Sequence, residues 1–253
     1  MSTILTERRG PILLITIDRQ DVRNAVDRAT AGALEAAADL LDSDDSLFVG
    51  VLTGAGGTFC AGADLKAAAR GERAITDRRG GFGFFAQPPR KPVIAAVEGY
   101  AVGGGFELCL ACDLIVAARD ARFGLPEVRH NLVASGGGLI RLPRRMPYHL
   151  AMEVALDGQP RSAQFFHRAG VVNRLAEPGQ ALSVAIAWAE GLLVNGPTAL
   201  AATKQIVSRA LDWTEAEAWE SQAPFVKSVR DSEDRKEGLA AFAEGRKPVW
   251  RGR

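Results

Sequence analysis

The chain alternates short apolar runs with longer Ala-rich stretches in which apolar residues recur at helical spacing. Continuous apolar runs are typical of strands that helices cover on both faces. Four such runs lie at residues 12–17, 47–52, 93–97 and 114–116. Between the first two, an apolar stripe from Val26 to Leu41 predicts an amphipathic helix with Asn24 as its N-cap. The pattern therefore predicts an α/β fold.

The last part of the chain has a different pattern. A short apolar segment at 170–175 predicts a final strand, and helical periodicity alone continues over 179–242. Breaks between these helices are expected at Gly196-Pro197 and at 212–214. Ser232 is expected to cap the last helix.

We expect an α/β core over residues 1–195 and a helical C-terminal region over 196–253. The C-terminal region has a high content of large aromatic side chains. They are Trp213, Trp219, Phe225, Phe242 and Trp250. Such rings either cover the α/β body of their own chain or form an interface between subunits.

Charge and composition exclude several classes of protein. Lys and Arg number 31 and Asp and Glu 30, a formal net charge of +1, which gives no global attraction to nucleic acid or to an anionic membrane. The first nine residues place charge after a short apolar stretch, the reverse of a secretory signal, and predict a cytoplasmic protein. The longest uncharged window, 46–63, is interrupted by glycines and predicts strand and loop instead of a membrane span.

Glycine is the residue type in clear excess. The chain has 27 glycines, whereas an average content would give about 18. They cluster at 54–57, 80–83, 103–105 and 136–138. Clustered glycines allow the backbone to approach a ligand or another segment closely. The cluster at 80–83 predicts no more than a mobile loop.

The predicted strand at 93–97 leads, after five residues, into the triplet Gly103-Gly104-Gly105, where a helix is expected to begin. A backbone N–H at such a junction has no intrahelical partner and lies at the positive end of the helix dipole, so it can donate to an anionic oxygen. Glu107 follows within the first turn. It lies near whatever the triplet binds, although a carboxylate at this position also stabilises a helix without any further role.

A second glycine-containing loop, 58–66, also follows a predicted strand and leads into a helical stretch. Two backbone donors that converge on one oxygen form an oxyanion hole, which stabilises a thioester enolate or a tetrahedral intermediate. A third element is Glu127, which lies 20 residues beyond Glu107. Paired carboxyl groups suit general acid/base catalysis when their environments separate their pKa values.

Other motifs carry less chemistry. No glycine cluster matches a P-loop or the dinucleotide-binding fingerprint. Cys109 and Cys112 have CxxC spacing on one apolar helix without a second pair, which predicts buried thiols and no metal site. The segments 70–91 and 119–145 each hold six basic residues and two acidic ones. They are either solvated loops or the surroundings of a bound polyphosphate.

Together these segments resemble the enoyl-CoA hydratase/isomerase (crotonase) family over nearly the whole chain. Residues 59–66 are similar to its first oxyanion and CoA loop, residues 91–113 to its signature stretch, and residues 237–250 to its C-terminal sequence. The resemblance implies a crotonase-like spiral of ββα units with a C-terminal helical trimerisation region. It also implies assembly as a homotrimer or a dimer of trimers.

The activity that the resemblance implies is reversible addition of water to a trans-2-enoyl-CoA, an acyl-CoA thioester, to give a 3-hydroxyacyl-CoA. No cofactor is implied, because coenzyme A is part of the substrate. The N–H groups of Ala63 and Gly104 would hold the thioester oxygen, and Glu107 and Glu127 would be the two catalytic glutamates, with Glu127 protonating C2. The residues implied to bind CoA or substrate are Arg23, Ala61, Ala63, Asp64, Leu65, Lys66 and Gly104.

One stretch departs from the usual hydratase pattern. Asn131 stands where glycine is usual, Ala134 replaces a proline, and Ser135 replaces a glycine near the water site. One alternative is a carnitinyl-CoA dehydratase, because such family members have a similar stretch and use the same elimination chemistry. A catalytically weak acyl-CoA-binding paralogue is another. An RNA-binding side activity is disfavoured by the net charge of +1 and by the lack of a lysine-rich helix.

Overall fold

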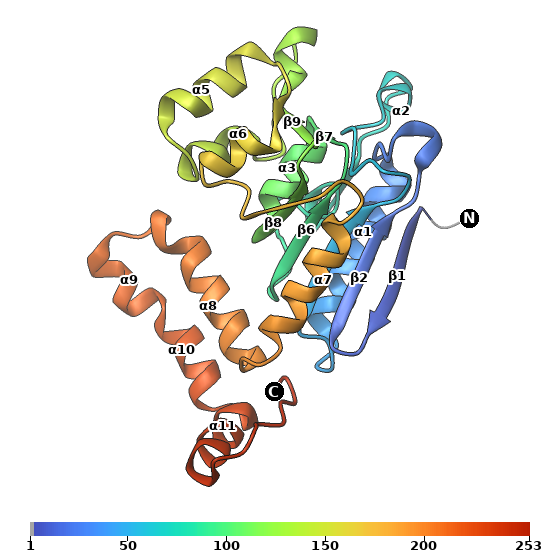
Figure 1. The fold of residues 1–253 in the computed structure, drawn as a ribbon. Helices are drawn as coiled ribbons and strands as arrows, with labels where there is room; N and C mark the ends of the chain where they lie inside the picture. Colours follow the sequence, from blue (N-terminus) through green and yellow to red (C-terminus); the bar gives the residue numbers. More distant parts are fainter. Residues whose placement is uncertain (1–2) are drawn as a thin grey trace.

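The computed structural model describes residues 3–253; Met1 and Ser2, where the N-terminal segment discussed above begins, lie outside them. The strands form a six-stranded sheet, a three-stranded sheet and a two-stranded ribbon (Figure 1). In chain order the strands are β1 (Ile4–Arg9), β2 (Ile12–Ile17), β3 (Val49–Gly54), β4 (Ile75–Thr76), β5 (Gly80–Gly81), β6 (Val93–Val97), β7 (Tyr100–Val102), β8 (Leu114–Ala118), β9 (Arg122–Gly124), β10 (Arg161–Ser162) and β11 (Arg174–Ala176).

Helices follow most of the strands and make up the C-terminal region as far as Glu244. They are α1 (Arg28–Ser43), α2 (Leu65–Ala69), α3 (Gly104–Ala111), α4 (Gly138–Arg141), α5 (Tyr148–Asp157), α6 (Ala163–Arg168), α7 (Ala181–Leu192), α8 (Pro197–Arg209), α9 (Glu215–Ser221), α10 (Ala223–Arg230) and α11 (Glu233–Glu244). Short 3-10 turns are η1 (Gln20–Val22), η2 (Pro126–His130), η3 (Leu142–Arg144) and η4 (Ala210–Asp212).

The large sheet has the order β1-β2-β3-β6-β8-β11, and only β1 runs antiparallel to its neighbour. Helices cover both faces, with α1 on one and α7 on the other (Figure 1). Leu13 and Ile15 of β2 are buried in the same cluster as Leu34 of α1. Ile12 and Leu14 point to the opposite face, into a cluster with alanines of α7. The continuous apolar runs of the sequence thus reflect strands buried on both sides.

The small sheet generates the spiral. Its strands β7 and β9 run parallel, and Cys60 pairs with Ala101 of β7 in an isolated parallel bridge. The chain therefore contributes a strand to the large sheet, then a short strand or bridge to the small sheet, and then a helix, which is the expected ββα repeat. Because three parallel segments end at the same edge, the residues that follow Cys60, β7 and β9 meet there.

The start of α1 differs from the expectation. Asp27, and not Asn24, is the N-cap, and its Oδ1 accepts a hydrogen bond from the Thr30 N–H at 2.8 Å. Asn24 is fully buried with φ of +58°. Its Nδ2 donates to the carbonyl of Ala55 at 2.8 Å and to that of Thr58 at 2.7 Å. Asn24 therefore ties the turn before α1 to the loop after β3.

The C-terminal helices begin where the sequence predicts. α8 starts at Pro197 after the break at Gly196, and the Ser232 Oγ caps α11 by accepting from the Arg235 N–H at 3.0 Å. Helices α8 to α10 extend away from the large sheet, with α11 beyond them (Figure 1). The boundary between the core and this region at residue 196 stays a prediction.

The aromatic rings of the C-terminal region divide between the two alternatives. Trp250 packs on the cluster between the large sheet and α7, so it does cover the body of its own chain. Trp219 and Phe242 do not, because they are 70% and 89% exposed.

No single helix within residues 3–253 is long and apolar enough to cross a membrane. α7 and the helical stretch 197–212 reach the required length and apolar content only when they are taken together, and a bend of 109° separates them.

Candidate active site

Two backbone N–H groups, those of Ala63 and Gly104, lie close together where the small sheet ends. The Gly62 carbonyl accepts from Val26 N and the Asp64 N–H donates to the Val26 carbonyl, so the peptide groups on either side of Ala63 are fixed. A Cβ on Gly62 would lie 3.2 Å from Gly104 N and 3.0 Å from the Val102 carbonyl oxygen. Neither Ala63 N nor Gly104 N donates to an acceptor within the described part of the chain. The two donors are therefore close together and available.

The glycine triplet is needed because other groups lie directly on it. A Cβ on Gly103 would lie 3.1 Å from Oε1 of Glu127, and one on Gly104 would lie 2.5 Å from Cζ of Phe82. A Cβ on Gly105 would lie 2.1 Å from the Cys60 carbonyl oxygen, which allows no side chain there. The expected close approach at this junction is thus present, and it involves protein groups on every side.

Glu107 is the buried carboxyl of the site. It lies in the first turn of α3, is 4% exposed, and its Oε1 accepts from the Gly138 N–H at 2.9 Å. Burial raises the pKa of Glu107, whereas the backbone N–H groups of Gly138 and Gly136 and the charge of Arg141 act in the opposite direction. These donors favour the ionised form of the carboxyl.

Glu127 lies at the start of η2, just after β9. Its Oε2 is buried and has no hydrogen-bond partner within residues 3–253. Burial first, and then the negative charge of Glu107, raise the pKa of Glu127 to about 7. The two carboxyls thus have different environments, in which Glu107 holds negative charge more readily and Glu127 holds a proton. This difference is what an acid/base pair requires.

The pKa of Glu127 predicts a pH dependence. In the free enzyme the pair must carry one proton, so kcat/KM for water addition should fall about tenfold for each pH unit above roughly 7, where Glu127 ionises. Addition of water takes up no net proton, so kcat/KM for elimination should fall with the same apparent pKa. Initial rates in both directions from pH 6 to 9 measure this. A flat profile over that range would contradict the role of proton donor that the resemblance implies for Glu127.

The predicted CoA loop is ordered by its own carboxylate. Asp64 caps α2 through Oδ1, which accepts from Lys66 N and Ala67 N at 3.0 and 3.1 Å, while its Oδ2 lies 3.1 Å from Arg19. The Asp64 side chain therefore holds the loop in place, so that of Asp64 only the backbone is left to contact CoA. The exposed side chains of Arg23 and Lys66 form no hydrogen bond or ion pair with any other part of 3–253. Arg23 lies beside the loop because its carbonyl accepts from Ala61 N at 3.0 Å.

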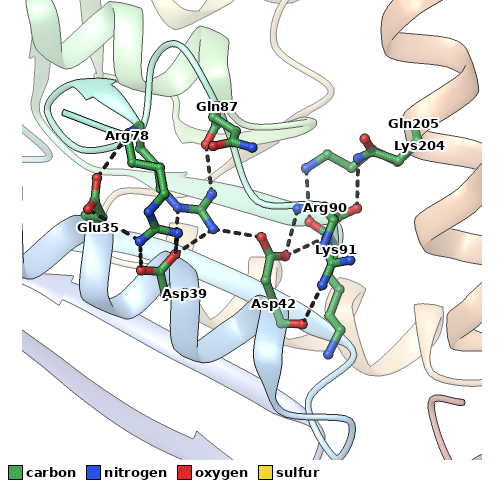
Figure 2. A network of polar contacts seen from close by, with 10 residues as sticks. Glu35, Asp39, Asp42, Arg78, Gln87, Arg90, Lys91, Lys204 and Gln205 are labelled. Carbon is green, nitrogen blue, oxygen red and sulfur yellow. Dashed lines mark hydrogen bonds and ion pairs between the residues drawn. The ribbon is translucent and has the colours of Figure 1, made fainter. Parts of the chain in front are cut away.

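The two basic stretches are mostly engaged elsewhere. Arg78 forms an ion pair with Asp39 of α1, and Arg90 donates to the Asp42 carbonyl (Figure 2). In the second stretch, Arg119 pairs with Glu177 at 2.8 Å. These contacts favour the first alternative, solvated loops, because carboxylates or carbonyls of the same chain already neutralise or bind such residues; a polyphosphate site in these segments stays a prediction.

The glycine cluster at 80–83 has a purpose that the sequence did not show. Gly83 packs against α1, where a Cβ would lie 2.2 Å from the Ala31 carbonyl oxygen. The loop brings Phe82 and Phe85 to the site, with ring centroids 4.7 Å apart. Three phenylalanines within four residues were the available signal, because such a loop needs a surface to cover. The sequence predicts no more than a mobile loop, whereas in the structure Phe82 and Phe85 form an aromatic wall at the site.

The departures after Glu127 have local explanations. Asn131 has φ of +55°, a conformation that glycine adopts freely and Asn tolerates better than most residues. Ala134 is 5% exposed and belongs to the core, and Ser135 is exposed beside Gly136.

Cys109 and Cys112 are buried free thiols, as expected, and burial raises the pKa of Cys112 to about 12.

Comparison with known proteins agrees with this geometry. A model of the enoyl-CoA hydratase/isomerase family matches residues 7–253. The crystal structure of enoyl-CoA hydratase EchA1 from Mycobacterium marinum is 54% identical, covers 100% of both chains and has a TM-score of 0.96. That of an enoyl-CoA hydratase from Mycobacterium tuberculosis H37Rv is 52% identical, with the same coverage and TM-score. A carnitinyl-CoA dehydratase from Salmonella enteritidis PT4 is 42% identical over 254 residues, which cover 97% of each chain.

These matches confirm the crotonase-like fold that the sequence predicts. They extend over the glycine loops, both glutamates and the C-terminal helices, because they span nearly the whole chain. The chain belongs to the enoyl-CoA hydratase/isomerase family.

Proposed function

We propose that this protein is an enoyl-CoA hydratase, a hydro-lyase that adds water reversibly to a trans-2-enoyl-CoA and gives the 3-hydroxyacyl-CoA. The observation that carries the proposal is the pair of carboxyls with separated proton affinities, Glu107 and Glu127, beside two available backbone donors. The thioester oxygen lies between Ala63 N and Gly104 N, where negative charge that develops in the enolate is stabilised.

The proton balance assigns one role to each carboxyl. Ionised Glu107 takes a proton from water while the water oxygen forms its bond to C3. The electron pair of the C2–C3 double bond moves onto the thioester as an enolate, which collapses as C2 takes the proton of Glu127. One proton enters the pair and one leaves it, so no external acid, base or cofactor is required.

The CoA moiety would run along Ala61 and Leu65, with its phosphates meeting Arg23 and Lys66, whose side chains carry no counter-charge within residues 3–253. Trp219 and Phe242 are exposed, which supports burial of the C-terminal region against other copies in a homotrimer or a dimer of trimers. A cytoplasmic location and the absence of nucleic-acid or membrane partners remain part of this proposal.

A carnitinyl-CoA dehydratase is the second candidate, because such a relative is 42% identical. Its acyl group would carry a trimethylammonium. Arg141 donates to the carbonyls of Gly136 and Phe85, which places a positive charge at the wall of the site. Like charges repel, so a cationic acyl group is disfavoured.

The deciding experiment follows loss of the enoyl-thioester absorbance with crotonyl-CoA and with crotonobetainyl-CoA. We expect kcat/KM for crotonyl-CoA to be greater by about tenfold or more, the ratio that a difference of 1.4 kcal/mol produces. The reverse order would identify the dehydratase. Tight binding of both without turnover would identify a catalytically weak acyl-CoA-binding paralogue.

A further inference from the structure

The loop between Arg79 and Gln87 places two aromatic rings against the groups that act on the substrate. Phe82 lies on Gly104, whose N–H is one oxyanion donor. Phe85 lies on Gly136, where a Cβ would be 2.3 Å from Cε2 of Phe85 and 2.5 Å from Oε2 of Glu107. The ring of Phe85 and the carboxyl of Glu107 therefore flank the same glycine. In the proposed function Glu107 directs water to C3, so a ring beside Glu107 would border the acyl chain near C3 and beyond it.

The far side of this wall is closed. Arg141 donates to the Gly136 carbonyl at 3.2 Å and also to the Phe85 carbonyl. It links the two segments that meet at the Phe85 ring. A longer acyl chain that ran in this direction would have to displace either the ring or this link.

The loop is held in a conformation that it would not adopt alone. Phe82 is 4% exposed and has φ of +54°, which is rare for a bulky residue and persists only where the surroundings impose it. Phe85 N donates to the Gly81 carbonyl at 2.9 Å and Ala86 N to the Arg79 carbonyl at 3.0 Å, so the loop closes on itself. Both ends of the loop depend on Arg79.

Arg79 is the anchor of the loop. Its side chain is 5% exposed and lies 2.8 Å from Asp39 and 2.9 Å from Asp42 of α1. The same guanidinium donates to the Gln87 carbonyl at 2.8 Å, at the other end of the loop. These three partners, Asp39, Asp42 and Gln87, are labelled in Figure 2. Arg78 shares Asp39 but is 55% exposed and makes no bond to Gln87.

We propose that Phe85 limits the length of the acyl group and that Arg79 is the positioning residue that fixes it against Gly136, so that the enzyme prefers short enoyl-CoA substrates. This inference rests on the proposed function for its catalytic readout. Arg79 touches no substrate. It acts through the loop, because its two carboxylate partners and the Gln87 carbonyl fix the loop at its base.

The test compares crotonyl-CoA with trans-2-decenoyl-CoA in Phe85→Ala, Arg79→Lys and the wild type. Phe85→Ala should raise the ratio of kcat/KM for decenoyl-CoA to that for crotonyl-CoA by at least about tenfold, since pocket contacts discriminate by such factors. The change should come mainly from KM of the long substrate. Arg79→Lys, which keeps the charge but cannot reach all three partners, should move the ratio in the same direction.

Arg78→Lys is the matched control, because it makes the same substitution on the neighbouring, exposed arginine and should leave the ratio unchanged. Phe85→Leu provides a smaller truncation if Phe85→Ala does not fold. An unchanged ratio in the Phe85 variant would overturn the length limit. Equal loss of kcat at both lengths in Arg79→Lys would make Arg79 merely structural.

Binding of saturated butyryl- and decanoyl-CoA separates this inference from the proposed function. These ligands cannot be hydrated. Their dissociation constants therefore report directly whether the aromatic wall limits the length of the acyl group. If the wild type hydrates no enoyl-CoA, the proposed function fails, while a tighter decanoyl-CoA complex in Phe85→Ala would still support the wall. If hydration occurs and the ratio of the dissociation constants for decanoyl-CoA and butyryl-CoA is the same in the wild type and in Phe85→Ala, the inference alone fails.

Discussion

Glu107→Gln and Glu127→Gln are each expected to lower kcat for hydration of crotonyl-CoA by about 10²- to 10⁴-fold, the usual contribution of a positioned acid or base. The amide keeps the size of the side chain but can neither take a proton from water nor deliver one to C2. Since neither carboxyl lies in the predicted CoA loop, the dissociation constant of a saturated acyl-CoA should remain nearly unchanged. Stopped-flow or steady-state absorbance and titration calorimetry measure the two quantities.

Glu98→Gln is the matched control. Glu98 also accepts two backbone N–H groups, those of Gly179 and Ala181, but at the start of α7. Its replacement tests whether loss of a carboxylate that accepts backbone N–H groups is by itself enough to remove activity. Turnover should stay close to that of the wild type. Full turnover in either active-site variant would assign proton transfer to another group.

Gly62→Ala is expected to lower kcat by about 10²- to 10³-fold, the loss seen when one oxyanion donor is removed. The added Cβ would lie 3.0 Å from the Val102 carbonyl oxygen and 3.2 Å from Gly104 N. It would push the Ala63 peptide away from the Gly104 peptide, so the two N–H groups could no longer converge on one oxygen. Because the charge that they stabilise develops during the reaction, kcat should fall more than acyl-CoA affinity.

Backbone strain is the competing explanation, since Gly62 has φ of +96°. Gly57→Ala controls for it: Gly57 has φ of +72° in the same loop, but nothing lies within 4 Å of an added Cβ. This variant should lose stability by about 1 kcal/mol and keep its turnover. Equal loss of turnover in the two variants would show that the left-handed conformation, and not the distance between the donors, is responsible.

Most of the large sheet could be predicted from sequence because β2, β3, β6 and β8 are apolar on both faces, whereas β1, which is exposed after Ile4, was not predicted. β2 and β6 have the expected bounds, and β3 and β8 differ by two residues at their ends. The small sheet could not be predicted, because β7 and β9 have three residues each and provide no periodicity. This sheet brings the three catalytic segments to one edge, so the geometry of the site depended on the least visible strands.

Predictions for single residues succeeded where local chemistry decides and failed where distant partners do. Ser232 caps α11 because a hydroxyl at that position satisfies the backbone of its own helix. Asn24 has the same cap chemistry, yet its amide is bonded to the loop after β3, more than 30 residues away. Likewise, the carboxylates that bind Arg79 lie some 40 residues earlier in the chain. No local pattern identifies such partners.

The buried carboxyl of Glu127 also affects how the stability of the fold varies with pH. Its pKa rises from an ordinary 4.5 to about 7 on folding, so the folded chain binds a proton that the unfolded chain releases over that interval. The contribution to stability is complete below about pH 4.5 and is lost as pH rises through 7. With partial exposure taken into account, the loss is on the order of 1 kcal/mol. Above neutral pH, the ionised Glu127 carboxylate thus makes the fold less stable than it is below neutral pH. The chain keeps its proton donor at this cost in stability.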